Sequence, residues 1–405
     1  MSTVSSPAGQ RSTARAQMLS RLAHSGRDVM CYTVGDERNI LLNHPDHVEH
    51  VLAANRANYS KDTAANRYFR TEIADGILTA DGDGWRRQRT LLNPVFRDRA
   101  RLATAAREAI AALVARLDKL ADTGRELNLS AAIGEVTLSI TVRALFGMSH
   151  EPFIDQCIAL GGALDDANSL LPGMDGAGPR DGLYRQLRAA LSASARGEYG
   201  PALAALADDP DHSGEALYQQ LVTLLLAGFE TTANSLTWAW ILLMQHPDVY
   251  EEWQHSLGTS AALTKALFDE TLRLYPSAWI LGRRALSDDH VGGVDIPAGA
   301  AVTISPFLLH RHPKFWDDAE AFRPHRFLPG GARPAHRYAY IPFGAGHRYC
   351  IGATYAHDEA EMILDELGRR FTFRSEHVAD ARPEHKFVLR APDPLRVTVH
   401  RRNTP

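Results

Sequence analysis

Residues 343–352, FGAGHRYCIG, combine residue types whose spacing points directly to chemistry. They place Cys350 in a short loop with three glycines and two basic residues. Gly344 and Gly346 can adopt positive φ and fold the backbone tightly, while Gly352 permits a flat or bulky group to approach the sulfur. A helix is expected directly afterwards, and its free N–H groups would stabilise a thiolate. The loop is therefore predicted to hold a sulfur anion.

Three roles are open to Cys350. A structural cysteine is expected among aliphatic neighbours on a helix or strand face, which is not its setting here. A nucleophilic cysteine needs a base, and His347 lies on the same tight loop, where it is badly placed to orient the sulfur. A metal ligand without a second protein ligand leaves the other coordination positions to a macrocycle, which is how cysteine holds haem iron. The third role explains the loop best.

A second unusual segment, AGFETT at residues 227–232, lies within an apolar stretch that is typical of a buried helix. Glycine, an acid and two threonines are unfavourable there, because each lowers helix propensity or needs a buried partner. Thr231 can donate back to the carbonyl of Ala227, and Gly228 would let the helix open. The segment predicts a groove for oxygen and water, although a threonine satisfied by its own helix is the alternative.

The pattern Phe-Gly-x-Gly-x-Arg-x-Cys-x-Gly resembles the haem-binding loop of the cytochrome P-450 monooxygenases. The resemblance extends from Trp85 to Gly352, and it implies haem b as the cofactor. It also implies that Cys350 is the axial ligand of the iron, that Phe343 shields the sulfur and that Arg348 reaches a haem propionate. Gly344 and Gly352 would then shape the cradle.

The segment Ala227–Thr232 matches the oxygen-activation signature of the same family, in which an acid precedes a threonine. By this resemblance, Thr231 holds an ordered water and Glu230 relays protons from solvent. Ala227 and Gly228 would lie beside the haem. Thiolate donation from cysteine favours cleavage of the O–O bond.

Further family motifs supply partners for the haem propionates. Trp85 and Arg89, at positions i and i+4, match a Trp-x-x-x-Arg motif. Propionates in an apolar pocket need donors, and the indole and guanidinium N–H groups are suitable ones. Arg283 matches another propionate arginine, with a one-residue ambiguity because Arg284 follows it.

Glu270 and Arg273 lie at i and i+3, where such a pair is usually only a solvated one. The resemblance implies instead that Arg326 joins them in a buried structural cluster behind the cysteine loop. His325 stands where the family most often has glutamate, which leaves only its local hydrogen bonding open.

The substrate pocket is expected to be mainly apolar, although each of its residues is equally explicable as core packing. The resemblance places its walls before Trp85, around residues 150–185, on the oxygen-activating helix, after Pro276 and near the C-terminus. The residues it assigns are Leu226, Ala227, Ala278, Ile280, Leu281, Val388 and Phe387.

The implied reaction inserts one oxygen atom from O2 into a hydrophobic small molecule, with a secondary metabolite or its precursor as the expected substrate. Hydroxylation is the default outcome. We expect a separate ferredoxin or flavodoxin, with its reductase, to supply electrons. A docking surface of Arg86, Arg87, Arg97, Arg99 and Arg101 is possible, as is a merely solvated helix face. A peroxide-driven peroxygenase and a non-catalytic haem sensor are the alternative functions.

The elements that must position these residues are mostly helical. The segment 29–43 predicts a β-hairpin, and residues 99–207 predict successive amphipathic helices broken at 172–179. A buried helix should begin at Ser213, as its N-cap, and stop at His246-Pro247. Another helix is expected at 261–274 and a last long helix at about 351–371, with short strands at 292–305. The sum is a mainly α fold with small β-sheets, in which a long central helix lies over the haem and the cysteine loop beneath it.

Composition excludes several other classes. The chain has 405 residues, 45% of them hydrophobic, and a net charge of −4, which excludes a disordered chain and a bulk nucleic-acid binder. Three widely spaced cysteines make neither a disulfide framework nor a zinc site. No apolar run reaches the about 20 residues of a membrane span. We expect a flexible tail at residues 1–20, one domain at 21–405, and a cytoplasmic monomer.

Overall fold

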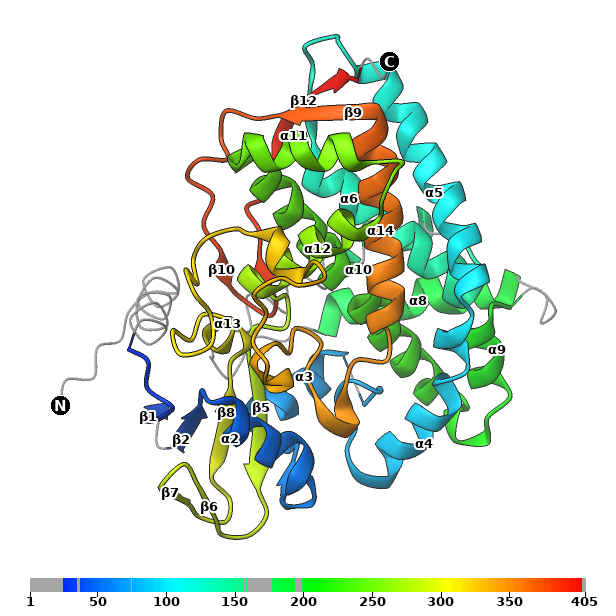
Figure 1. The fold of residues 1–405 in the computed structure, drawn as a ribbon. Helices are drawn as coiled ribbons and strands as arrows, with labels where there is room; N and C mark the ends of the chain where they lie inside the picture. Colours follow the sequence, from blue (N-terminus) through cyan, green and yellow to red (C-terminus); the bar gives the residue numbers. More distant parts are fainter. Residues whose placement is uncertain are drawn as a thin grey trace.

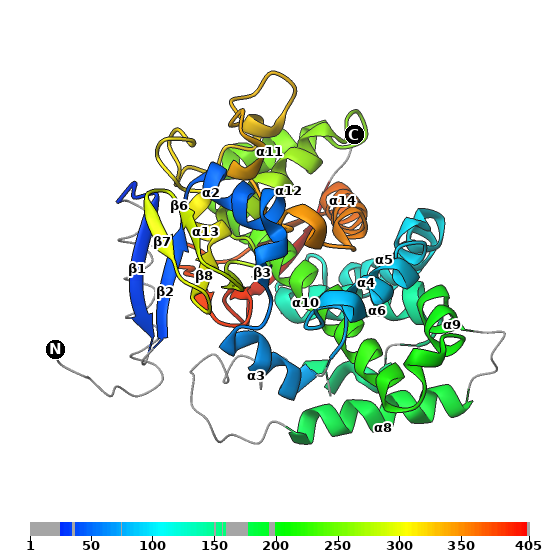
Figure 2. The same ribbon diagram turned by 90° about the horizontal axis from the view of Figure 1, so that it is seen from below.

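The computed structural model describes residues 25–34, 37–73, 75–149, 151–155, 157–158, 177–193 and 199–402. The predicted tail at residues 1–20 lies outside this part of the chain. Helices fill most of the molecule, and a smaller strand-rich region lies at the lower left of Figure 1. From below, the strands gather on one side and α5 and α9 on the other, with α10 between them (Figure 2). The predicted mainly α architecture with small sheets is therefore confirmed.

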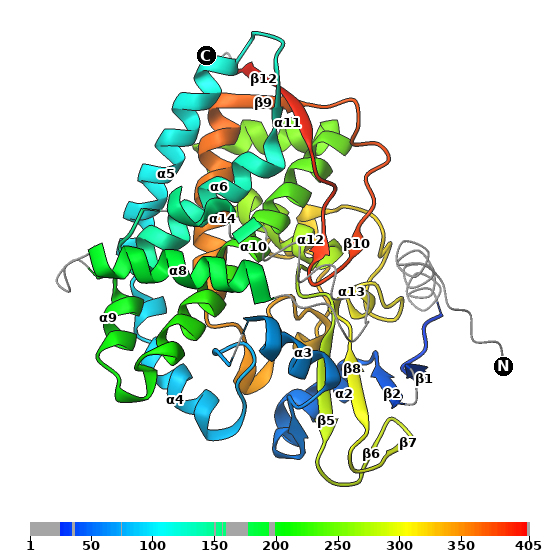
Figure 3. The same cartoon turned by 180° about the vertical axis from the view of Figure 1, so that it is seen from behind.

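The helical region is built around one long helix, and α8 crosses it on the face seen from behind (Figure 3). Most of the other helices are amphipathic and bury one face against this core. The helices are α2 (Pro45–Glu49), α3 (Ala64–Ile73), α4 (Gly82–Leu92), α5 (Arg99–Leu120), α6 (Leu129–Thr141), α8 (Ala177–Ala193), α9 (Pro201–Ala207), α10 (Glu215–Gln245), α11 (Pro247–Ser256), α12 (Ala262–Leu274), α13 (Pro306–Leu309) and α14 (Ala353–Arg370).

The central helix, α10, is buried on most sides, as its apolar sequence predicts. It ends at Gln245 before His246 and Pro247, again as predicted. Its start differs from the prediction, because Gly214, with φ +59°, occupies the capping position in place of Ser213. Glycine reaches this left-handed φ without strain, so the chain turns into the helix there and not at the serine.

Strands form one five-stranded sheet and three smaller ones. The larger sheet has the order β1-β2-β8-β5-β3, in which β2 and β8 are parallel and the other neighbours antiparallel. The hairpin predicted at 29–43 is confirmed as β1 and β2. The strands are β1 (Val29–Val34), β2 (Glu37–Leu42), β3 (Tyr59–Ser60), β4 (Glu126–Asn128), β5 (Leu281–Ala285), β6 (Asp289–Val291), β7 (Val294–Ile296), β8 (Ala301–Ile304), β9 (Phe371–Arg374), β10 (Glu384–His385), β11 (Leu389–Arg390) and β12 (Arg396–Arg401).

Among the residues that the structure describes, one helical segment has the length and composition of a membrane span. It is Leu129–Phe146, and 72% of it is buried inside the molecule. Burial of this extent is what a core helix of a folded domain shows.

A buried ion pair on α12 fixes the chain behind the cysteine loop. Glu270 and Arg273 are fully buried, and their two contacts measure 2.7 and 2.8 Å. Arg273 also donates to the carbonyls of His310, Ala319 and Ala321. Because every donor has an acceptor, the guanidinium joins three separate segments without leaving an unpaired buried charge.

The meander arginine completes this cluster. The Nε of Arg326 lies 3.4 Å from Glu270, and its Nη2 donates to the carbonyl of Asp318. The backbone N–H of Arg323 donates to the same glutamate at 2.8 Å. His325 points outward and contacts Glu252 at 2.9 Å. Glu270 and its partners are thus buried together, in contrast to the solvated pair that spacing alone suggests.

A second polar centre supports the cysteine loop from the sheet side. The carboxylate of Asp289 accepts hydrogen bonds from Tyr59 at 2.6 Å, from His50 at 2.8 Å and from Asn55 at 2.9 Å. His50 begins the helical turn His50–Ala54, which packs against the loop. Burial acts to raise the pKa of the Asp289 carboxyl, but these hydrogen bonds outweigh burial and lower that pKa to about 2.

Asp289 should make the stability of the protein depend on pH, and its replacement should remove that dependence. The depressed pKa stabilises the fold above about pH 4, and that contribution is lost as the pH falls through about 2. Asp289→Asn is expected to lower the free energy of unfolding at pH 7 by about 2 kcal/mol, and the difference should shrink below pH 4. Urea unfolding followed by circular dichroism measures both. Asp295→Asn, which alters an exposed pair with His290, is the control and should change little; a pH-independent difference would contradict the argument.

Candidate active site

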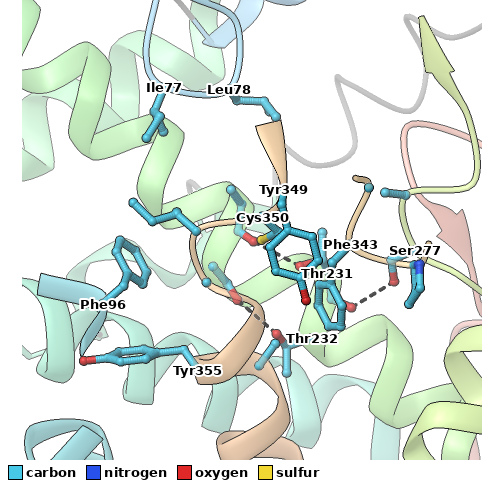
Figure 4. Close-up of a pocket in the computed structure, with 18 of the residues that line it drawn as sticks. Ile77, Leu78, Phe96, Thr231, Thr232, Ser277, Phe343, Tyr349, Cys350 and Tyr355 are labelled. Carbon is cyan, nitrogen blue, oxygen red and sulfur yellow. Dashed lines mark hydrogen bonds between the residues drawn. The ribbon is translucent and has the colours of Figure 1, made fainter. Parts of the chain in front are cut away.

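A cavity of about 310 Å³ lies between α10 and the cysteine loop. Figure 4 shows Cys350 and Phe343 of the loop together with Thr231 and Thr232 of α10. Most of the lining is apolar. The lining residues before, on and just after α4 are Lys61, Ile77, Leu78, Trp85, Arg89 and Phe96. Those of α5, α6 and its extension are Leu102, Ile140, Thr141, Ala144 and Leu145, and those of α10 are Ala227, Gly228, Thr231, Thr232 and Ser235. The helix α12, the loop after it and β5 contribute Phe268, Leu272, Ser277, Ala278, Leu281 and Arg283, and further lining residues lie within 342–359.

Cys350 lines this cavity and is an exposed residue there, although the protein around it still affects the pKa of its thiol. Its backbone N–H donates to the carbonyl of Phe343 at 3.0 Å, which closes the loop. Burial raises the pKa of the thiol, while the N–H of Gly352 and the charge of Arg89 act to lower it. The amide contribution is the one expected from the start of α14, but burial outweighs it. A stable thiolate therefore requires a further positive partner at the sulfur.

The glycines of the loop do what the sequence predicts. Gly344 and Gly346 have φ of +69° and +71°. A Cβ on Gly346 would lie 1.9 Å from the carbonyl oxygen of Leu52, so the loop can approach the turn His50–Ala54 only without one. Gly352 precedes the first residue of α14, and a Cβ there would face Phe96 at 3.6 Å and the sulfur at 4.0 Å.

Positive charge gathers at one end of the cavity. Arg348 contacts Asp81 at 2.5 Å and lies over the ring of Trp85 at 4.4 Å. Arg283 is buried, with its Nη1 bonded only to the neighbouring carbonyl of Gly282 among the contacts described. Its pKa is lowered to about 10 by burial and by Arg348. Arg283, and not Arg284, therefore reaches the cavity, since Arg284 points outward to the carbonyls of 62 and 299.

Lys61 adds a cation that the sequence motifs do not reveal. Its ammonium donates to the carbonyl of Leu78 and lines the cavity. Burial, Arg283 and Arg348 lower its pKa to about 7. Lys61 lies in the loop before α3 and is not part of any motif with a defined spacing, so only the three-dimensional arrangement identifies it.

The charges at this cavity do not balance. Among its described lining residues, Lys61, Arg89, Arg283 and Arg348 are basic, and Glu359 is the acid. Burial raises the pKa of Glu359 well above its usual value, which favours the neutral form. Buried cations without matching anions are costly, so this end fits a ligand that brings its own negative charges. The two propionates and flat ring of haem, with Cys350 facing the same space, meet that requirement.

Arg89 lies close to the cysteine loop. Its Nη1 donates to the carbonyl of Tyr349 at 2.7 Å and its Nε to Asn93 at 2.9 Å. The guanidinium thus holds the residue next to Cys350, one turn of helix away from Trp85.

The oxygen-activating segment of α10 differs from the prediction in one respect. Thr231 donates to the carbonyl of Ala227 at 3.0 Å, as predicted, and Thr232 donates to Gly228 at 3.3 Å. The α-helix nevertheless continues without a break through these residues. A Cβ on Gly228 would lie 2.8 Å from the methyl group of Thr141, so the glycine allows α6 to pack closely and does not open the helix.

Glu230 does not lie among the residues that line the cavity. Its carboxylate contacts Arg390 of β11 at 2.5 Å, and its side chain is buried. Asn234, one turn further along α10, bonds the backbone of Leu389 and of Ala391, the residues on either side of that arginine. The acid thus faces the C-terminal hairpin, about 100° around the helix from Thr231.

Of the seven residues predicted for the substrate pocket, three line the described cavity and four do not. Ala227, Ala278 and Leu281 line the cavity, whereas Leu226, Ile280, Phe387 and Val388 are absent from its described lining. Ile280 precedes Leu281 and points to the opposite side, where it packs near Trp279. Leu226 and Val388 are buried in the core, and Phe387 packs edge-on against Phe69 at 4.9 Å.

Several lining residues were not predicted from the sequence. Ile77, Leu78, Thr141 and Leu145 come from apolar runs that resemble ordinary core. Ser235 follows Thr231 by four residues and so lies on the same face of the helix, which makes it the lining residue of this group that the sequence could have indicated. The wall predicted at residues 150–185 lies mainly outside the described residues.

The arginines proposed as a docking surface are largely paired. Arg86 contacts Asp83, Arg87 lies 3.4 Å from Asp211, and Arg99 contacts Asp358 at 2.6 Å. Arg101 donates to the carbonyl of Ala144. Their net positive charge is therefore much smaller than the sequence suggests.

Comparisons with known proteins agree with this geometry. The family model described as cytochrome P-450 matches residues 7–155 and 202–399. Cyclooctatin synthase of Streptomyces melanosporofaciens is 32% identical over 94% of this chain and 90% of its own length. Pentalenene oxygenase of Streptomyces avermitilis is 35% identical over 49% of this chain and 47% of its own.

Solved structures of P-450 proteins from Thermus thermophilus share the fold. Two of them, each 28% identical, superpose with TM-scores of 0.77 and 0.79. The matches cover 94% and 96% of this chain, and 98% and 96% of the two structures. Together with the cysteine loop and its cavity, these matches show that the chain belongs to the cytochrome P-450 family of haem-dependent monooxygenases.

Proposed function

We propose that this chain binds haem b through Cys350 and oxidises a neutral, mainly apolar small molecule, with electrons from a separate ferredoxin or flavodoxin system. The observation that carries the proposal is one cavity with Cys350 in its loop wall, Thr231 in its helical wall and unbalanced cations at one end. When bound, haem supplies the iron at which O2 is reduced and one oxygen atom transferred.

The residues around the cavity divide the task of holding the haem. Cys350 would ligate the iron, and the ring of Phe343 would cover the sulfur. Arg283, Arg348 and Lys61 would bind the propionates, since each lines the cavity and the three cations outnumber Asp81, the carboxylate that contacts Arg348. Trp85 supports Arg348 from below, and Arg89 holds the loop carbonyl beside the cysteine.

Thr231 is proposed to hold the water through which protons reach the oxygen site. Its hydroxyl donates to Ala227, so its lone pairs remain available towards the cavity. Glu230 lies outside the cavity beside Arg390, which is partly open to solvent. A carboxylate in that position suits proton entry from solvent, with a side-chain movement needed before the proton reaches Thr231.

The substrate is proposed to be a terpenoid-like secondary metabolite, with hydroxylation as the default reaction. The lining around Ile77, Leu145 and Leu281 is apolar and the volume modest. Pentalenene oxygenase and cyclooctat-9-en-7-ol 5-monooxygenase, the latter 28% identical over 88% of this chain, act by their names on an alkene and an alkenol.

The electron donor is proposed to be a separate acidic protein that docks near the cysteine loop. Most of the arginines there are already paired, and Arg97 has no partner among the described contacts. A small positive patch of this kind predicts weak, salt-sensitive docking. We further propose a cytoplasmic, monomeric protein.

Replacement of Cys350 tests whether this residue ligates the haem iron, on which the rest of the proposal depends. The reduced protein should give the thiolate-type spectrum with carbon monoxide, and Cys350→Ser should not, because an alcohol does not provide the thiolate. Cys31→Ser, at an exposed strand position, is the control and should keep the spectrum. Turnover with NAD(P)H and a ferredoxin system, compared with peroxide alone, then separates a monooxygenase from a peroxygenase. Absence of both activities would favour a sensor.

Thr231→Ala should uncouple electron use from product formation. Haem and substrate binding should remain, while product formed per NAD(P)H falls about tenfold or more and hydrogen peroxide rises, since proton delivery commonly contributes at least 10²-fold. Thr237→Ala removes a comparable hydroxyl that bonds to Ala233 outside the cavity, and it should stay coupled. Unchanged coupling in the Thr231 variant would count against the role.

Lys61→Met should weaken haem retention. Loss of one charge-assisted contact is expected to speed haem transfer to apomyoglobin about tenfold, while Lys61→Arg should preserve most of the retention. Lys119→Met, at the exposed end of α5, is the control. Equal transfer rates in wild type and Lys61→Met would exclude a propionate contact from this lysine.

A further inference from the structure

Four of the hydroxyl groups that line the cavity belong to α10 and to the loop after α12. They belong to Thr231, Thr232, Ser235 and Ser277. Figure 4 shows Ser277, from the loop after α12, beside Thr231. Because the surrounding lining is apolar, these groups decide which polar atom of a substrate can be accommodated on this wall.

The two serines share one acceptor. Ser235 and Ser277 each donate to the carbonyl oxygen of Thr231 at 2.9 Å, and their own oxygens are 3.0 Å apart. Both side chains are almost fully buried. Whether Ser235 donates to the carbonyl of Thr231 or to the hydroxyl of Ser277, its hydrogen is bonded to a protein oxygen and not offered to a ligand.

Asn234 fixes the direction of the second serine. Its side-chain nitrogen donates to the carbonyl of Leu389 at 2.7 Å and to the oxygen of Ser277 at 3.2 Å. Its side-chain oxygen accepts from the N–H of Ala391 at 2.6 Å, so the amide cannot be turned round. Ser277 is therefore an acceptor towards Asn234, and its single hydrogen is directed to Thr231.

The threonine hydrogens are also occupied. Thr231 donates to the carbonyl of Ala227 and Thr232 to that of Gly228. All four hydroxyl hydrogens thus bond to protein oxygens, whereas lone pairs on these oxygens remain. On this wall, the described hydroxyls can accept a hydrogen bond but have no hydrogen left to give.

We propose that this wall selects a substrate that presents either hydrocarbon or a hydroxyl group, and discriminates against a carbonyl, ether or carboxylate in the same position. The inference rests on the proposed function and specifies its substrate class. A hydroxyl donates its hydrogen to Ser235 or Ser277. At this wall a carbonyl oxygen must either stay without a donor or draw a hydroxyl hydrogen away from the peptide carbonyl that accepts it, and either outcome costs about tenfold in affinity.

A matched set of ligands on one skeleton tests this selection. The haem-loaded protein is titrated with adamantane, 1-adamantanol, 1-methoxyadamantane and 2-adamantanone, and Kd is read from the haem spin-state shift. The alcohol should bind about tenfold more tightly than the ketone and the ether. Adamantane-1-carboxylate should produce no shift. Equal Kd values for alcohol and ketone, or binding of the carboxylate as tight as that of adamantane, would overturn the inference.

Two variants assign the effect to the serines. In Ser235→Ala and in Ser277→Ala, the preference for 1-adamantanol over 2-adamantanone should fall to about threefold or less, with the Kd of adamantane changed by less than about twofold. Two variants are used so that a folding defect in one leaves the other informative. Thr237→Val, which removes a buried α10 hydroxyl outside the cavity, is the matched control and should keep the full preference.

The haem site and the selection for hydroxyl groups can fail separately. A protein that gives the thiolate carbon monoxide spectrum and binds adamantane, but does not prefer the alcohol, supports the haem site and refutes the hydroxyl selection. A protein without that spectrum refutes the proposed function itself. A thiolate spectrum with no shift for any ligand contradicts the apolar pocket on which the selection depends.

Discussion

The position of the Cys350 sulfur is the constraint on which the rest of the structure depends. Burial raises the pKa of the thiol, so a thiolate there needs a positive partner close to the sulfur. Such a contact requires a rigid loop. The Glu270–Arg273 pair holds the chain behind the loop, and the Asp289 centre holds the turn against which Gly346 packs. The Glu270 cluster and the Asp289 centre, neither of which lines the cavity, therefore both help to fix the position of the Cys350 sulfur.

The cavity has a positively charged end and an uncharged wall on α10, and this difference would orient a bound ligand. Lys61, Arg283 and Arg348 gather at one end, whereas the α10 wall carries only hydroxyls whose hydrogens are bonded. A ligand with a charged edge is stabilised at the first end and a neutral one at the second. A haem placed by its propionates would present its iron to Cys350, and an apolar substrate would be left with the space beside α10.

Local sequence signals predicted the elements and the cofactor loop well. Glycines 344 and 346 have the positive φ that their spacing suggested, α10 ends at its proline, and the Thr231 hydrogen bond follows from helix geometry alone. Such features depend on residue type and on the spacing of hydrophobic residues over a few neighbouring positions, which the sequence shows directly. The family resemblance added the Glu270 cluster, whose burial its i, i+3 spacing would not indicate.

Contacts between distant segments could not be predicted in the same way. Glu230 was expected to serve the cavity, but its neighbour is Arg390, 160 residues later, and the bond forms because Asn234 fixes β11 on either side of that arginine. Gly228 was expected to open its helix, and it instead admits α6. In both cases the face of α10 that meets a partner is decided by packing between segments. The same holds for Ser235 and Ser277, whose hydroxyls meet at the carbonyl of Thr231 because the loop after α12 packs against α10, while Asn234 ties both elements to the chain at Leu389.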